Sequence, residues 1–241
     1  MTRAIIRVSG ADRDAFLKGL LTRDVPTDGG LGYAALLSPQ GKYLADFLCF
    51  RDEGAVWLDT HADLAPALVQ RLSMYRLRAD VGIDGVDRGV ACGTGDAPAG
   101  AMADPRPGMG WRHYDGAASD GTDWDAVRVA HMVPAYETEL VPNDSYILEW
   151  GFDRLGGVDF RKGCYVGQEV TARMKHKTEL RKGMARVRLD GPAAPGDPIT
   201  ADGRPAGHLC TVAGDRALAY LRFDRAGGGM TAGASTLHRD A

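Results

Sequence analysis

The sequence predicts an α+β protein that ends in a small β-barrel-like module. Within the first 83 residues, strand-like and helix-like segments follow the order β-α-β-β-(β)-α-β, which is typical of a ferredoxin-like unit. After residue 183 the pattern changes to short strands, and the dipeptides Asp202-Gly203 and Gly214-Asp215 mark hairpin turns between them. The 32 glycines and 12 prolines among 241 residues agree with many turns and much β-structure.

The elements of the N-terminal region follow from hydrophobic periodicity. The first helix is amphipathic, with Phe16, Leu17, Leu20 and Leu21 on its apolar side. A Pro-Gln-Gly turn at residues 39–41 favours a hairpin between the second and third strands. The expected strands cover residues 3–8, 32–37, 43–50, 55–59 and 77–83, with a turn at Asp52-Glu53-Gly54, and the expected helices cover residues 12–20 and 62–75.

The middle of the chain carries weaker signals. Short strands are expected over residues 89–92 and 110–114, and Asp104-Pro105-Arg106-Pro107-Gly108 is expected to be a turn or linker without chemistry. Thr122, followed by an acid three residues later, is expected to cap a helix that runs to residue 131.

The last part of the chain is expected to form the β-barrel-like module. Its strands are predicted over residues 184–189, 199–200, 207–213 and 217–223. The glycine-rich exit at 227–229 and the tail behind it are expected to be poorly ordered or simply terminal. We therefore expect one α+β region over residues 1–182, with a sub-boundary near 84–121, and the barrel-like module over residues 183–241.

Composition excludes several classes of protein. A formal net charge of −3 argues against a general nucleic-acid binder. Cys49, Cys92, Cys164 and Cys210 are widely separated, which is neither a disulfide framework nor a zinc ribbon, so we expect no metal site and a reducing, cytoplasmic location. The N-terminal apolar run is too short for a signal peptide, and no window approaches the roughly 18 apolar residues that span a bilayer.

Residues 161–169 are the strongest candidate for chemistry. Cys164 lies between two glycines, behind Arg161 and Lys162, and ahead of a segment with good helix composition. Cations and a helix N-terminus favour a thiolate, so we expect a thiol pKa below the free value of about 8.5. Two alternatives remain open: Cys164 is a small core residue, or the glycines mark only a helix entry.

The segment Lys162-Gly163-Cys164-Tyr165-Val166-Gly167-Gln168-Glu169 resembles the signature of the YgfZ family. These folate-binding proteins assist iron–sulfur cluster assembly and repair, and they are related to the aminomethyltransferase (T-protein) of the glycine cleavage system. The resemblance implies ferredoxin-like units around a tetrahydrofolate cavity, and a Cys164 that handles a cluster transiently while Lys162 keeps it ionised. It also implies that Gln168 and Glu169 orient the loop and that Gly163, Tyr165 and Gly167 contact the folate.

Three further residues are tied to the folate by resemblance. Asp46, in the expected strand 43–50, matches the place where the aminomethyltransferase relatives carry a carboxylate that faces the pterin; its alternative is a solvent-facing strand residue. Trp124 and Arg128 resemble the segment that lines the cavity, with Trp124 as a pterin contact or, alternatively, a core aromatic. The chain departs from the family pattern at residues 130–134, where Glu-x-Gly-x-Pro is usual.

A basic run follows the signature. Residues 161–188 hold nine lysines and arginines against two acids, a formal charge of +7, which leaves −10 for the rest of the chain. Such an asymmetry favours an anionic partner, namely the glutamate tail of folate, a phosphate or an acidic protein surface. The alternative is a solvated helix face.

Three functions are therefore open. The resemblance implies an iron–sulfur cluster assembly or repair factor whose partners are folate and client or assembly proteins. If the chain is an enzyme, it is expected to be a folate-dependent one-carbon transferase, although it is short for the full architecture of that enzyme. The third possibility is a binding module without chemistry, in which Cys164 is a packing residue.

Overall fold

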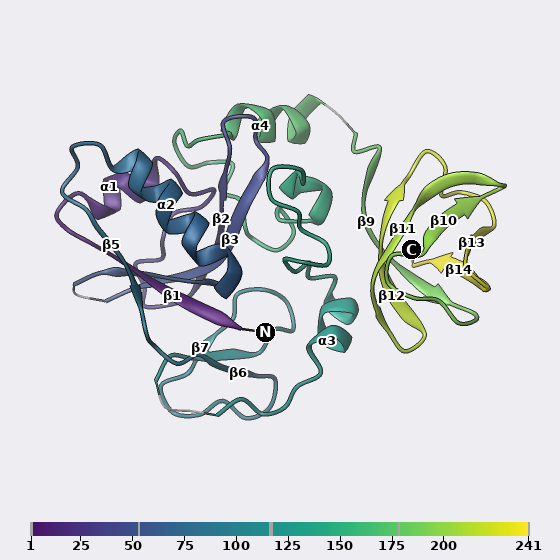
Figure 1. The fold of residues 1–241 in the computed structure, drawn as a ribbon, viewed down its shortest axis with the longest axis horizontal. Helices are drawn as coiled ribbons and strands as arrows, with labels where there is room; N and C mark the ends of the chain where they lie inside the picture. The colour runs from purple at the N-terminus through teal and green to yellow at the C-terminus, as the bar shows by residue number, and fades with distance from the viewer. Residues whose placement is uncertain (1, 53, 116–117, 178, 241) are drawn as a thin grey trace. The chain divides into compact units, whose positions relative to one another are not determined.

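The computed structural model describes residues 2–52, 54–115, 118–177 and 179–240, and the chain forms two compact units (Figure 1). Unit 1 comprises Met1–Thr122, Pro142–Asp144 and Phe152–Ala172; unit 2 comprises Asp123–Val141, Ser145–Gly151 and Arg173–Ala241. Unit 2 thus takes more of the chain than the barrel-like module expected over residues 183–241. Glu53 of the predicted turn and the side chain of Lys177 lie outside the described residues.

Unit 1 is built on a five-stranded antiparallel sheet in the order β2-β3-β4-β1-β5. The strands are β1 (Arg3–Ser9), β2 (Gly32–Leu37), β3 (Tyr43–Arg51), β4 (Val56–His61) and β5 (Gly82–Val86). Their order along the chain is the predicted one. Strands β2, β3 and β4 form a meander, and β1 pairs antiparallel with both β4 and β5, so the sheet is antiparallel throughout.

The core of unit 1 lies on this sheet. Every residue of β2 is buried, and Leu68 and Leu72 of helix α2 (Ala65–Arg76) are buried one turn apart. The short helix α1 (Arg13–Lys18) buries Leu17. The predicted strand over 77–83 was wrong in position, because Leu77 ends α2 with φ 47° and an 88% exposed side chain, and β5 begins only at Gly82.

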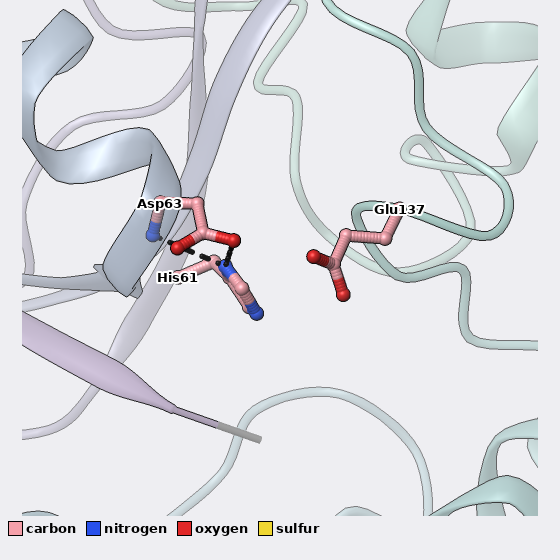
Figure 2. Close-up of side chains that lie close together, drawn as sticks. All are labelled: His61, Asp63 and Glu137. Atoms are coloured by element: carbon pink, nitrogen blue, oxygen red, sulfur yellow. Dashed lines mark hydrogen bonds and ion pairs between the residues drawn. The ribbon is translucent and has the colours of Figure 1, made fainter.

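A histidine cap starts the second helical segment of unit 1. His61 Nδ1 accepts a hydrogen bond from the Asp63 backbone N–H at 3.3 Å, at the beginning of the 3-10 turn η1 (Ala62–Leu64) that leads into α2 (Figure 2). Such a cap satisfies one of the unpaired N–H groups of a helix start. Glu137, also drawn in Figure 2, belongs to unit 2 and is no part of this cap.

A small sheet completes unit 1. It has the order β6-β8-β7, with β6 over Ala91–Gly93, β7 over Met102–Ala103 and β8 over Trp111–His113. Strands near the first and last of these were expected; β7 was missed. The loop from β7 to β8 was expected to be a turn without chemistry, but it buries the side chains of Asp104 and Arg106.

Unit 2 contains a closed six-stranded barrel in the order β10-β11-β12-β9-β14-β13. Its strands are β9 (Lys182–Leu189), β10 (Pro198–Ala201), β11 (Arg204–Ala213), β12 (Arg216–Arg222), β13 (Met230–Ala232) and β14 (Ser235–Arg239). The expectation of a poorly ordered tail was wrong, because β13 pairs with β10 and β14 pairs with β9. Without these two strands, β9 and β10 would be open edges with unpaired backbone groups.

The other elements of unit 2 precede the barrel. Helix α3 (Trp124–His131) is capped by Asp123, whose carboxylate accepts from the backbone N–H groups of Asp125 and Ala126. The expected cap, Thr122, instead donates its hydroxyl to Asp120. A 3-10 turn, η2, covers Ile147–Trp150. Helix α4 covers Gln168–Lys177 and belongs to both units, with its residues through Ala172 in unit 1 and those from Arg173 in unit 2. In the part of the chain that the structure describes, no helix is long and apolar enough to cross a membrane.

Candidate functional site

Cys164 lies exposed on the loop of residues 161–167, which we call the Cys164 loop. Helix α4 begins at Gln168, so the thiol precedes the helix instead of occupying its cap. Because the side chain is exposed, the alternative of a packing residue in the core was wrong. The chain thus presents a free thiol on the surface of unit 1.

The end of the Cys164 loop packs closely on the turn between β2 and β3. Gly167 has φ +85°, and a Cβ there would lie 2.7 Å from the carbonyl oxygen of Ser38 and 2.9 Å from Cβ of Leu37. On the other side of the contact, a Cβ on Gly41 would lie 2.7 Å from Cβ of Val170. Both glycines are therefore required by close approach as well as by backbone conformation.

Lys162 anchors the start of the loop inside unit 1. Its ammonium group donates to the carbonyl oxygens of Lys18 at 3.0 Å and Leu21 at 2.7 Å, and it pairs with Asp24 Oδ1 at 3.1 Å. An ammonium group has three N–H donors, so these acceptors use all of them. Burial lowers the pKa of Lys162, and the charge of Asp24 opposes that shift. No N–H of Lys162 is left to donate to Cys164, and the role of keeping the thiol ionised through the charge of Lys162 stays a prediction.

Two further contacts hold the loop. The Val166 N–H donates to the carbonyl oxygen of Gly19 at 3.2 Å. The Tyr165 ring is buried, with its centroid 5.4 Å from Lys162 Nζ. Burial raises the pKa of Tyr165 to about 12, so its phenol stays neutral at physiological pH. The residues on both sides of Cys164 are thus fixed to the segment that follows α1.

The other residues of the signature are less constrained. Gly163 is exposed, and a Cβ there would meet nothing within 4 Å. Gln168 is half-buried at the start of α4, and Glu169 is exposed in its first turn, where the helix dipole favours a carboxylate. Among the described residues, no hydrogen bond joins either side chain to Cys164.

The remaining cysteines are less accessible than Cys164. Cys49 and Cys210 are buried, and burial raises the pKa of each thiol to about 12. Cys92 is half-buried. All four cysteines are free thiols, and among the described residues Cys164 is the one whose side chain is exposed.

Asp46 forms a second candidate site in unit 1. Its side chain is half-buried on β3, where Oδ2 accepts the hydroxyl of Tyr33 at 3.0 Å and Oδ1 accepts that of Tyr43 at 2.7 Å. Burial, and then the charge of Asp46, raise the pKa of both tyrosines well above the usual 10. The phenols therefore remain donors, and the carboxylate is held in one orientation.

Four buried charged residues and the part-buried Arg3 lie next to this site, and we call them the arginine–aspartate network (Arg3, Asp59, Asp104, Arg106 and Arg112). Arg106 forms two hydrogen bonds with the Asp104 carboxylate, at 2.9 and 2.6 Å, and its guanidinium lies 4.9 Å from the Tyr33 ring centroid. Arg112 lies 3.4 Å from Asp104 and 3.7 Å from Asp59. Arg3 pairs with Asp59 at 2.6 Å.

Sequence reasoning missed this network. One signal was present, because Asp59 ends an apolar strand segment, and an acid buried in a sheet needs a cation. The partners of Asp59 are far away along the chain, so no local pattern could have named them.

Trp124 and Arg128 belong to unit 2, whereas Asp46 and the Cys164 loop belong to unit 1. Trp124 is half-buried at the first position of α3. Arg128 is buried and is bound by Glu139 at 2.7 Å, Asp125 at 2.9 Å and Thr211 at 2.7 Å. Its Nε is left without a hydrogen-bond partner. Arg128 thus joins α3 to β11 within unit 2.

The basic run is partly neutralised by nearby acids. Arg186 pairs with Asp240, and Arg188 pairs with Asp190 at 2.7 Å. Lys182 lies 3.8 Å from Glu149. For residues 182–188 of the run, these ion pairs favour the alternative of a solvated surface whose positive charges are neutralised by neighbouring acids.

Comparison with known proteins identifies both the fold and the family. The solved glycine cleavage system aminomethyltransferase T from Bartonella henselae superposes with a TM-score of 0.74 over 98% of this chain and 82% of that protein, at 14% identity, which shows a shared fold. The family model described as "CAF17, C-terminal beta-barrel domain" matches residues 181–240 of this chain.

Sequence relatives give the closer assignment. The mitochondrial iron–sulfur cluster assembly factor IBA57 of Mus musculus is 31% identical over 92% of this chain and 76% of its own length. The human protein of the same name is 30% identical over 91% of this chain and 75% of its own length. The predicted kinship with cluster assembly factors is confirmed, the glycine cleavage aminomethyltransferase shares the fold, and the chain belongs to the IBA57/CAF17 family of iron–sulfur cluster assembly factors.

Proposed function

We propose that this chain assists iron–sulfur cluster assembly or repair in client enzymes through Cys164, and that it binds tetrahydrofolate through a site that includes Asp46. The observation that carries the proposal is the exposed, free Cys164 on a loop fixed by Lys162 and Gly167. A thiolate is the ordinary ligand of a cluster iron. A loop that is already ordered presents such a ligand without the free-energy cost of ordering it on contact.

The proposed chemistry is ligand exchange without a redox step. Cys164 loses its proton to solvent and forms one Fe–S bond to the cluster, while a thiolate of the donor leaves that iron. Because a cluster usually has four cysteine ligands, one cysteine shares the cluster with a client or an assembly protein and then releases it.

Cys164→Ser is expected to lower maturation of a [4Fe–4S] client enzyme at least tenfold, because a hydroxyl at neutral pH is a poor iron ligand. Client activity and cluster absorbance in cells that carry the variant measure the effect. Cys92→Ser, which changes a half-buried thiol of the same unit, is the matched control and should leave maturation unchanged. Normal maturation with Cys164→Ser would contradict the proposed role.

The folate part of the proposal rests on Asp46. A half-buried carboxylate oriented by Tyr33 and Tyr43 suits the N–H donors of a pterin. In such a site Asp46 would hold the pterin. A bound tetrahydrofolate would act either as a carrier of one-carbon groups or as a regulatory ligand.

Asp46→Asn is expected to weaken tetrahydrofolate binding about 10- to 100-fold, because a charged acceptor becomes a neutral one, a loss of about 1.5–3 kcal/mol. Isothermal titration calorimetry under anaerobic conditions measures the affinity. Asp84→Asn, an exposed acid on β5, is the control and should bind like the wild type. Equal affinities of both variants would remove Asp46 from the site.

The alternative, a folate-dependent aminomethyltransferase, draws support from the fold alone, and one fold supports different activities. Aminomethyl transfer to tetrahydrofolate by the purified protein would favour it. We also propose a reducing compartment, the cytoplasm as the sequence suggests, because all four cysteines are free. The relatives in mouse and human are named mitochondrial.

A further inference from the structure

We infer that Asp24, which lies outside the signature, is the positioning residue of the Cys164 loop and acts through its ion pair with Lys162. The inference deepens the proposed function of Cys164 and rests on it for its biological meaning. Its test, however, measures the order of the loop directly and does not depend on cluster transfer.

The first step of the argument is the charge of Lys162. Its side chain is 0% exposed, so its ammonium group has lost its water. The carbonyl groups of Lys18 and Leu21 satisfy two N–H donors but carry only partial charge. Among the described residues, the carboxylate within 4.0 Å of this ammonium group is that of Asp24. A buried charge without a counter-ion is strongly destabilising.

The second step is that Asp24 is available for this role alone. Its side chain is 50% exposed, and Lys162 is its ion-pair partner in the described part of the chain. Asp24 also lines a pocket of about 330 Å³, together with Lys18, Arg23 and Arg51. A change of Asp24 to asparagine therefore removes a charge without opening a cavity in the core.

The third step connects the pair to Cys164. Lys162 holds the loop two residues before the thiol, while Val166 and Gly167 hold it after the thiol. Loss of the Asp24 charge weakens the first attachment and leaves the second intact. Cys164 would then stay on the surface, but on a loop that no longer presents it in one position.

Asp24→Asn is expected to increase amide hydrogen exchange over residues 161–166 at least tenfold, with the sheet strands unchanged, as measured by mass spectrometry on the full chain. Asp24→Glu, which restores the charge, should return exchange to within about twofold of the wild type. Asp28→Asn is the matched control, because Asp28 is exposed in the same loop and its Oδ1 accepts the Gly30 N–H. Exchange at the wild-type level in Asp24→Asn would overturn the inference.

A double-mutant cycle separates the ion pair from other effects of Asp24. Lys162→Met alone should also raise exchange over residues 161–166. If Asp24 acts through Lys162, adding Asp24→Asn to Lys162→Met should change exchange less than twofold. A full additional increase would overturn the inference. Client maturation is measured in parallel, and if Cys164→Ser leaves it normal, the proposed function fails while the exchange data still decide the role of Asp24.

Discussion

Asp59→Ala is expected to destabilise unit 1 by about 3–5 kcal/mol, the range measured when one partner of a buried ion pair is removed. Asp59 is 0% exposed and faces Arg3 at 2.6 Å and Arg112 at 3.7 Å. It also accepts the hydroxyl of Tyr114 at 3.1 Å. The substitution removes the carboxylate that pairs with the part-buried Arg3, removes one of the two carboxylates near the buried Arg112, and leaves one buried phenol without its acceptor.

Urea denaturation, followed by hydrogen exchange in β1 and β4, measures the stability of unit 1 separately from that of the barrel. Asp84→Ala, an exposed acid on β5, is the control and should change the free energy of unfolding by less than about 0.5 kcal/mol. A loss below about 1 kcal/mol for Asp59→Ala would mean that the arginine–aspartate network is hydrated and does not organise the core.

Gly167→Ala is expected to displace the Cys164 loop and to destabilise unit 1 by about 2–4 kcal/mol. A positive φ in an L-residue accounts for about 1–2 kcal/mol, and the rest comes from overpacking. The added methyl group would lie 2.7 Å from a backbone oxygen of Ser38, which cannot move aside as a flexible side chain would. We therefore also expect client maturation to fall at least tenfold.

Gly163→Ala is a control within the same signature. A Cβ at Gly163 meets nothing within 4 Å, and its φ is outside the left-handed region. Thermal unfolding and client maturation should therefore match the wild type within about 0.5 kcal/mol and twofold, respectively. If Gly163→Ala and Gly167→Ala behaved alike, the packing of Gly167 on the β2–β3 turn would not be what places Cys164.

Much of the fold could be predicted because its signals are local. Strands β2 and β3 follow from apolar runs on either side of a Pro-Gln-Gly turn, and the observed bounds agree to within one residue. The barrel hairpins follow in the same way from their turn dipeptides. The tail was missed because β13 and β14 have only three and five residues, too short for periodicity to show.

By itself the sequence determined the α+β class, the barrel and the position of the signature that contains Cys164, since each depends on residues close together in the chain. Only the tertiary structure decided the partners of the charges. Lys162 reaches Leu21, 141 positions away, and Arg3 reaches Asp59, 56 positions away. A buried charge takes whichever opposite charge the fold brings within a few ångströms, and sequence spacing carries no record of that distance.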